Sequence, residues 1–212
     1  MVQFAKAELH VGSPERAEAM VSLLETKSAI DVHDEYELAG LFREKRLYPA
    51  MLRRLQRIAQ NEPMSWEAKY DVGIGLLYNG EFSDAARLLE GLVAERAEDA
   101  NVLSLLGTAY EQGGETAKAL DAYQRAVKAD PNNPERYLDY TRLLMELDRF
   151  DEAANIVESG ANRTPQDYAL KIRAGAIKFD QGEMEDARQI YELQNDKNRM
   201  LKLRKRNIFL TQ

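Results

Sequence analysis

One pattern of residue types returns every 34 positions along this chain, and it constrains the possible fold more than any other feature. Stepping by 34 residues without a gap finds the pattern from Val32, Trp66, Ala100, Pro134 and Tyr168. A period of this length is typical of chains that stack one small structural unit many times. The copy that starts at Ala100 is the clearest, and its members are Leu103, Leu106, Gly107, Tyr110, Gly114, Ala119, Tyr123, Ala126 and Pro131.

Each copy of the pattern predicts two short helices. Apolar residues recur three and four positions apart, as Leu103 and Leu106 do, which forms one stripe of an α-helix. Small residues such as Gly107 and Ala119 permit two antiparallel helices to approach closely. A turn glycine such as Gly114 ends the first helix, because glycine adopts left-handed dihedral angles at little cost. One helix pair cannot bury its own apolar stripe, so neighbouring pairs must stack.

These residues and their spacing resemble the tetratricopeptide repeat, a 34-residue helix–turn–helix motif. The resemblance implies an all-α fold, a right-handed α-solenoid of stacked antiparallel helix pairs whose first helices line a concave face. It divides the chain into a repeat array over residues 1–196 and a basic C-terminal capping segment or tail over residues 197–212. The expected units of the array are a partial repeat over 1–31 and repeats over 32–65, 66–99, 100–133, 134–167 and 168–196.

Both ends of the array depart from the pattern. Lys171 and Lys178 fall on positions that should be apolar, so the last repeat is degenerate or its first helix is rotated. Carried back to the N-terminus, the register places Met1 part-way through a first helix. We therefore expect either a segment of a longer protein or a degenerate opening helix that acts as a cap.

The resemblance places binding on the concave face, at residues of the first helices that lie away from the core stripe. The helix that starts at Trp66 is apolar nearly all round, which requires a second buried partner. The alternative is that neighbouring helices cover this surface. We expect a protein or peptide partner that is apolar and, because acidic residues lie between the apolar pockets, basic in part. The candidate groove residues are Tyr36, Glu67, Tyr70, Ile74, Leu77, Tyr78, Ser104, Thr108, Leu138, Arg142, Met145, Ile172 and Phe179.

One known binding mode of the family is absent. Chaperone cofactors of this family clamp a C-terminal carboxylate with Lys and Asn at fixed positions of the first helices. At one of these positions the successive repeats carry Tyr36, Tyr70, Ser104 and Leu138 instead. A partner that ends in acidic residues is therefore not expected.

Signals of catalysis, cofactors or metals are weak. The segment Gly73-Ile74-Gly75 falls in the middle of a predicted helix, where it cannot form a phosphate-binding loop. His10 and His33 lie far apart in the register, and the chain has no cysteine, so we predict neither a metal site nor a disulfide. Solvated helix faces explain the many acids. We predict no enzymatic activity, no cofactor and no small-molecule substrate.

Charge is distributed unevenly, with a formal net charge of −7 for the whole chain. Residues 197–212 hold six of the 29 bases and none of the 36 acids. An acidic body argues against general nucleic-acid binding, which requires clustered Lys and Arg. The basic tail could cap the last repeat, dock into an acidic groove, or contact lipid or nucleic acid. No stretch approaches the roughly 18 apolar residues of a membrane span, and we do not expect a membrane partner. We expect a cytoplasmic protein; the alternative is a segment of an exported or membrane-attached protein.

Three functional hypotheses remain at this stage. The first is a scaffold or adaptor that holds a peptide or helix of a partner protein in the concave groove. The second is a regulatory or substrate-recruiting segment of a larger enzyme or signalling protein. The third is self-assembly of the chain into a homo-oligomer through its solenoid ends.

Overall fold

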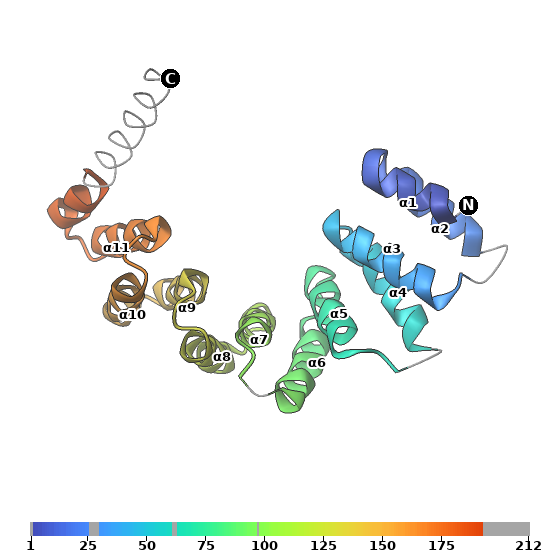
Figure 1. Cartoon of the computed structure of the whole chain (residues 1–212). Helices are drawn as coiled ribbons and strands as arrows, with labels where there is room; N and C mark the ends of the chain where they lie inside the picture. Colours follow the sequence, from blue (N-terminus) through green and yellow to red (C-terminus); the bar gives the residue numbers. More distant parts are fainter. Residues whose placement is uncertain (1, 26–29, 61–62, 97, 193–212) are drawn as a thin grey trace, which may run out of the picture. The chain divides into compact units, whose positions relative to one another are not determined.

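The computed structural model describes residues 2–25, 30–60, 63–96 and 98–192. All regular secondary structure in these residues is α-helical (Figure 1). Residues 184–192 are helical as well. The helices are α1 (Val2–Val11), α2 (Pro14–Glu25), α3 (Val32–Glu44), α4 (Tyr48–Ala59), α5 (Trp66–Tyr78), α6 (Phe82–Glu95), α7 (Ala100–Gln112), α8 (Thr116–Ala129), α9 (Pro134–Glu146), α10 (Phe150–Arg163) and α11 (Tyr168–Asp180).

The odd-numbered helices from α3 to α11 start at regular intervals. They begin at Val32, Trp66, Ala100, Pro134 and Tyr168, each 34 residues after the one before. A side-chain oxygen caps each of these five starts and satisfies backbone N–H groups that have no partner within the helix. The caps are Asp31 to Asp34 N, Ser65 to Ala68 N, Asp99 to Asn101 N and Val102 N, Asn133 to Glu135 N, and Asp167 to Leu170 N.

The same turn joins the two helices of each pair from α3 onward. One residue of this turn has a positive φ, and the next backbone N–H donates to a carbonyl five residues earlier. This arrangement satisfies carbonyls at the end of the first helix. Arg46 and Asp148 adopt the left-handed conformation where the other three turns have glycine. The positive-φ residues of these five turns are Arg46, Gly80, Gly114, Asp148 and Gly182.

The chain divides into two compact units, which we describe separately. The first contains residues up to 97 together with 105–119, and the second contains residues 98–104 and those from 120 onward. In the first unit α1 packs on α2, α3 on α4 and α5 on α6, while α4 also packs on α5 and α1 on α3. In the second unit α10 packs on both α9 and α11. The predicted all-α fold of stacked helix pairs is thereby confirmed.

Two glycines let α5 lie close to both of its neighbours. A Cβ atom at Gly73 would lie 2.9 Å from Leu89 Cδ2 of α6, and a Cβ at Gly75 would lie 3.2 Å from Leu52 Cβ of α4. Such distances leave no room for a side chain without movement of the neighbour. The segment Gly73-Ile74-Gly75 is thus a packing feature in the middle of a helix.

The final helix pair stays in the stack despite its lysines. In α11 the buried residues are Leu170, Gly175 and Ile177, and α11 packs on both α9 and α10. Lys171 Nζ donates to the carbonyl of Pro165, and Lys178 Nζ pairs with a Glu183 carboxylate oxygen at 2.7 Å. The two lysines therefore keep their ammonium groups at the surface while Leu170 and Ile177 remain buried. The predicted capping segment or tail over residues 197–212 lies outside the described residues.

Candidate functional site

Within each unit the first helices of successive pairs lie side by side, and we call the face that they share the first-helix surface of that unit. In the first unit Lys6 of α1 forms ion pairs with Asp34 and Glu37 of α3. Arg43 of α3 binds both carboxylate oxygens of Asp71 in α5, at 2.8 and 3.0 Å. These pairs connect α1 to α3 and α3 to α5 at the surface.

The centre of this surface in the first unit is an apolar stripe on α5. Tyr70, Ile74 and Tyr78 are four residues apart, so they lie along one face of the helix. Tyr78 is 66% exposed, and Tyr70 and Ile74 are half-buried. The other faces of α5 are packed against α4 and α6. An apolar stripe that the fold leaves partly open is a candidate contact surface.

Aromatic contacts hold both ends of this stripe. Tyr78 stacks on Tyr48, the first residue of α4, with ring centroids 3.8 Å apart and an interplanar angle of 7°. Tyr70 stacks on Trp66 at 5.8 Å, and the Arg96 guanidinium lies 4.3 Å from the centroid of the Trp66 ring. Because neighbouring side chains contact these rings, the rings have less rotational freedom to lose when a partner binds.

The second unit presents a more polar surface on α9 and α11. Arg142 binds Glu146 at 3.0 Å and also lies 3.5 Å from the Tyr123 hydroxyl. Arg173 of α11 lies 3.7 Å from the Met145 sulfur of α9. Burial, and secondarily the nearby Arg142 charge, lowers the pKa of Arg173. The carboxylates of Asp139 and Glu146 also lie near these guanidinium groups, so this surface carries charges of both signs beside the Met145 sulfur.

The structure places most predicted groove residues at the surface but buries two of them. Leu77 is 9% exposed, and Ser104 is 7% exposed with its hydroxyl accepting from Arg136 Nη1 at 3.0 Å. Both residues point away from solvent because their helices pack against neighbours on that side, so neither offers much area to a partner. The exposed candidates are Glu67, Tyr78 and Phe179, and the half-buried ones are Tyr36, Tyr70, Ile74, Thr108, Leu138, Arg142, Met145 and Ile172.

The predicted groove residues are divided between the two units. Tyr36, Glu67, Thr108 and the residues of α5 belong to the first unit, and Ser104 and the residues of α9 and α11 belong to the second. The sequence analysis missed Tyr48, Trp66 and Arg173. Tyr48 opens the second helix of one pair and Trp66 opens the first helix of the next. Aromatic residues also open the second helices α6 and α10, at Phe82 and Phe150, and this recurrence is the signal that could have identified Tyr48.

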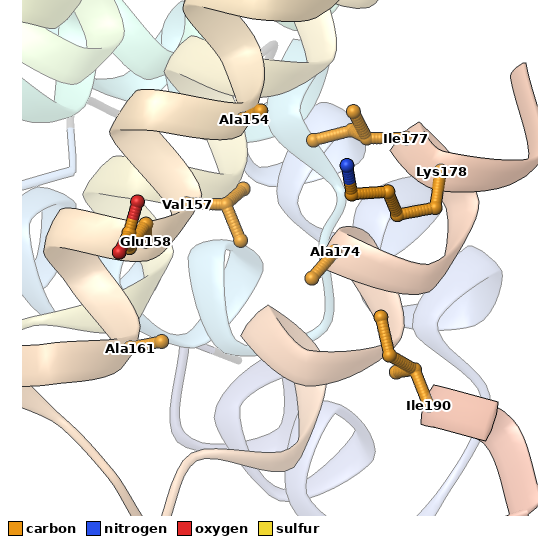
Figure 2. A pocket seen from close by; sticks show the side chains of 8 residues that line it. All are labelled: Ala154, Val157, Glu158, Ala161, Ala174, Ile177, Lys178 and Ile190. Atoms are coloured by element: carbon orange, nitrogen blue, oxygen red, sulfur yellow. The ribbon is translucent and has the colours of Figure 1, made fainter. Parts of the chain in front are cut away.

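The second unit also contains an apolar cavity of about 350 Å³ between α10, α11 and residues 184–192. Figure 2 shows side chains from α10 and α11 facing one another across it. Ala154 and Ala161 of α10 stand where α8 has Leu120 and Val127, so smaller side chains leave this space unfilled. Its lining residues are Ala154, Val157, Glu158, Ala161, Ala174, Ile177, Lys178 and Ile190.

Two further features bear on other functions. Among the described residues no group of three or more His, Cys, Asp or Glu side chains is arranged to hold a metal ion. None of the helices in the described part of the chain combines the length and the apolar character that crossing a membrane demands.

Comparison with known families identifies the repeats. Two tetratricopeptide-repeat family models match this chain, one over residues 70–134 and the other over residues 110–174. The chain is a tetratricopeptide-repeat protein. The helix pairs described above are its repeats, and the turn with a positive φ joins the two helices of each repeat.

Solved structures of MamA proteins have the same fold as this tetratricopeptide-repeat protein. A MamA crystal structure aligns over 79% of this chain and 92% of its own, with a TM-score of 0.66 and 18% sequence identity. MamA of Desulfovibrio magneticus RS-1, from residue 41 to its end, aligns over 78% of this chain and 94% of its own, with a TM-score of 0.63 and 23% identity. At such identities the likeness shows the fold alone.

Two curated relatives are much longer than this tetratricopeptide-repeat protein. "Protein CTR9 homolog" of Arabidopsis thaliana is 26% identical over 161 residues, which are 72% of this chain and 14% of the relative. "BBSome complex member BBS4" of Bos taurus is 23% identical over 128 residues, which are 60% of this chain and 24% of the relative. The chain therefore spans about a seventh of the plant protein and about a quarter of the bovine one.

Proposed function

We propose that this chain is a non-catalytic interaction scaffold that binds an apolar segment of a partner protein on its first-helix surface. The observation that carries the proposal is the stripe of Tyr70, Ile74 and Tyr78 on α5, which is apolar, ordered and partly open. Exposed aromatic residues held in place by their neighbours supply much of the binding energy at many protein interfaces.

The chemistry of the surroundings supports a partner of defined character. Glu67 and Asp71 lie beside the stripe, and both already have arginine partners, at 3.5 Å and 2.8 Å respectively. The stripe therefore offers apolar contact area rather than unpaired charge. We expect the partner to contribute an amphipathic helix or an extended segment with apolar residues at regular spacing. The repeat family supports protein binding in general, and one relative carries membership of a complex in its name.

A site-specific photo-crosslinking experiment in the source cell tests the proposal. A photoreactive amino acid at Ile74 should crosslink to a partner, whereas the same group at Leu23, an exposed apolar residue of α2, should not. Tyr70→Ala combined with Tyr78→Ala should abolish the crosslink at position 74 while the helical circular-dichroism signal persists. Equal crosslinking at positions 23 and 74, or a crosslink that the double substitution leaves unchanged, would refute the assignment of this surface.

A further inference from the structure

The apolar cavity of the second unit lies where one part of the stack has smaller side chains than the other repeats have. Ala174 of α11 and Val157 of α10 both line it. At the place of Ala174 the first helices α3, α5, α7 and α9 have Leu38, Val72, Leu106 and Tyr140. At the place of Val157 the second helices α4, α6 and α8 have Leu55, Leu89 and Tyr123. Smaller residues on two facing helices therefore leave a space that the side chains of the other repeats would fill.

Alanine also occupies the two other apolar positions at which α10 lines the cavity. These residues are Ala154 and Ala161. The corresponding pairs in α4, α6 and α8 are Leu52 and Ala59, Ala86 and Val93, and Leu120 and Val127. Each of these three helices thus has a larger residue at one or both positions. Because voids larger than a water molecule are few in protein interiors, four small residues around one space favour a binding role for it.

The cavity can be reached from solvent and has the size of a small-molecule site. Ala154, Ala161 and Ala174 are half-buried, whereas Val157 and Ile177 are buried and therefore lie deeper. Its volume of about 350 Å³ lies at the lower end of the range for such sites, about 300–1,000 Å³. These sites combine mostly apolar walls with a few polar groups. The cavity therefore suits a small ligand that is mainly apolar.

Two charged side chains of the lining determine which polar group such a ligand should carry. Glu158 of α10 and Lys178 of α11 lie on opposite sides of the cavity (Figure 2). Lys178 Nζ pairs with Glu183 at 2.7 Å, and this hydrogen bond, together with the charges of Glu183, Asp186 and Asp151, raises the pKa of Lys178. Glu158 is exposed and forms no hydrogen bond or ion pair with any residue that the structure describes. The uncompensated charge beside the cavity is therefore negative.

We propose that this cavity binds a small cationic amphiphile, with its alkyl chain between α10 and α11 and its ammonium group paired with Glu158. Burial of the alkyl chain against the apolar walls drives binding. The Glu158 carboxylate favours a cation, and the pairing of Lys178 with Glu183 leaves little attraction for an anion. This site belongs to the second unit and is independent of the α5 stripe, which belongs to the first.

Three probes with the same chain and different head groups test the site: octylammonium, octan-1-ol and octanoate. Isothermal titration calorimetry of the full chain should show saturable binding of octylammonium, about tenfold tighter than that of octanoate, with octan-1-ol between them. Octylammonium should shift the methyl NMR signals of Val157, Ile177 and Ile190, which line the cavity, and leave that of Ile74 unchanged. Tightest binding of octanoate, or no saturable binding of any probe, would overturn the proposal.

Two variants assign the binding to the cavity and to its acid. Ala154→Leu combined with Ala161→Val gives α10 the residues that α8 has at these positions, and should abolish octylammonium binding without lowering the melting temperature. Glu158→Gln should reduce the affinity for octylammonium to that for octan-1-ol and leave the affinity for octan-1-ol unchanged.

The matched control for Glu158→Gln is Glu135→Gln, which removes the same charge from an exposed position of α9 outside the cavity. This control should keep the wild-type preference for octylammonium. Undiminished binding to the double variant would show that the ligand lies elsewhere. A preference for octylammonium that survives Glu158→Gln would overturn the role of this carboxylate.

Discussion

The rings of Tyr48 and Tyr78 stack face to face across the junction between α4 and α5, with centroids 3.8 Å apart. Tyr48 opens the second helix of one repeat, and Tyr78 closes the first helix of the next. The same contact that joins the two repeats also fixes one end of the α5 stripe. Packing between repeats and the order of the candidate binding surface are therefore coupled at this pair.

A double-mutant cycle should detect this coupling in the free protein. Tyr48→Ala and Tyr78→Ala should each lower the free energy of unfolding, and the two losses should not add. We expect a coupling energy of about 0.5–1.5 kcal/mol, the range for stacked aromatic pairs. Urea denaturation of the four proteins provides the measurement. Strictly additive losses would mean that the stack contributes nothing beyond the burial of each ring.

Two glycines of the first unit should respond to substitution in opposite directions. Gly73→Leu places atoms where Leu89 already lies and should destabilise the chain by about 1–3 kcal/mol. Gly91→Ala, in the interior of α6 with no atom within 4 Å of the added Cβ, should instead stabilise it by about 0.5–1 kcal/mol. Thermal denaturation of both variants decides the matter. A Gly73→Leu variant as stable as the wild type would remove this glycine from the contact between α5 and α6.

A buried carboxylate holds α3 against α4. Glu35 accepts from Arg54 Nη1 at 3.3 Å and from Arg57 Nε at 3.0 Å. The side chains of Glu35 and Arg54 are each 4% exposed, and burial lowers the pKa of Arg54 to about 10, so this arginine still carries its charge at neutral pH.

Glu35→Gln should therefore be strongly destabilising, because it removes a counter-charge from a buried guanidinium. Breaking a buried ion pair from one side costs about 3–5 kcal/mol. Glu18→Gln is the matched control, because Glu18 pairs with Arg53 at the surface, and it should cost no more than about 1 kcal/mol. Chemical denaturation at neutral pH compares the two. Equal losses would contradict the buried character of the Glu35 cluster.

The stability of the chain should fall as the pH rises above about 10. Burial raises the pKa of both Tyr137 and Tyr140 above their ordinary value of 10.0. Between the unfolded and the folded pKa the folded state binds more protons than the unfolded state, so raising the pH favours unfolding. Tyr140→Phe removes one of these groups, and its free energy of unfolding should decline less steeply between pH 9 and pH 11, a range set by the ordinary tyrosine pKa of about 10. An unchanged pH dependence in this variant would show that Tyr140 does not contribute.

Much of the fold follows from the sequence, because the 34-residue period is tied to packing. The residues that recur are those that must be small or apolar where helices meet, as Gly73 and Leu89 are. A prediction of the turns from glycine alone would have identified only some of them, since Arg46 and Asp148 adopt positive φ where glycine is expected. There the turn is fixed by the packing of the two helices it joins and not by the conformational freedom of its residue.

The candidate site was less predictable, because burial at one position depends on which neighbour packs there. Ser104 and Tyr70 occupy the same position in successive repeats. Tyr70 is half-buried there, whereas Ser104 is buried because the guanidinium of Arg136 covers its hydroxyl. The Tyr48–Tyr78 stack joins two repeats, and a period within one chain does not reveal which side chains meet between repeats. Such contacts require coordinates.

Methyl NMR tests most directly whether partners bind on the first helices. The measurement uses the chain and the partner that photo-crosslinking at Ile74 identifies. On addition of the partner, the methyl signals of Ile74, in the α5 stripe, should shift or broaden. Those of Leu23 and Ile156, which lie on the second helices α2 and α10, should stay unchanged. Perturbations confined to α2 and α10, with the Ile74 signal unaffected, would contradict the account.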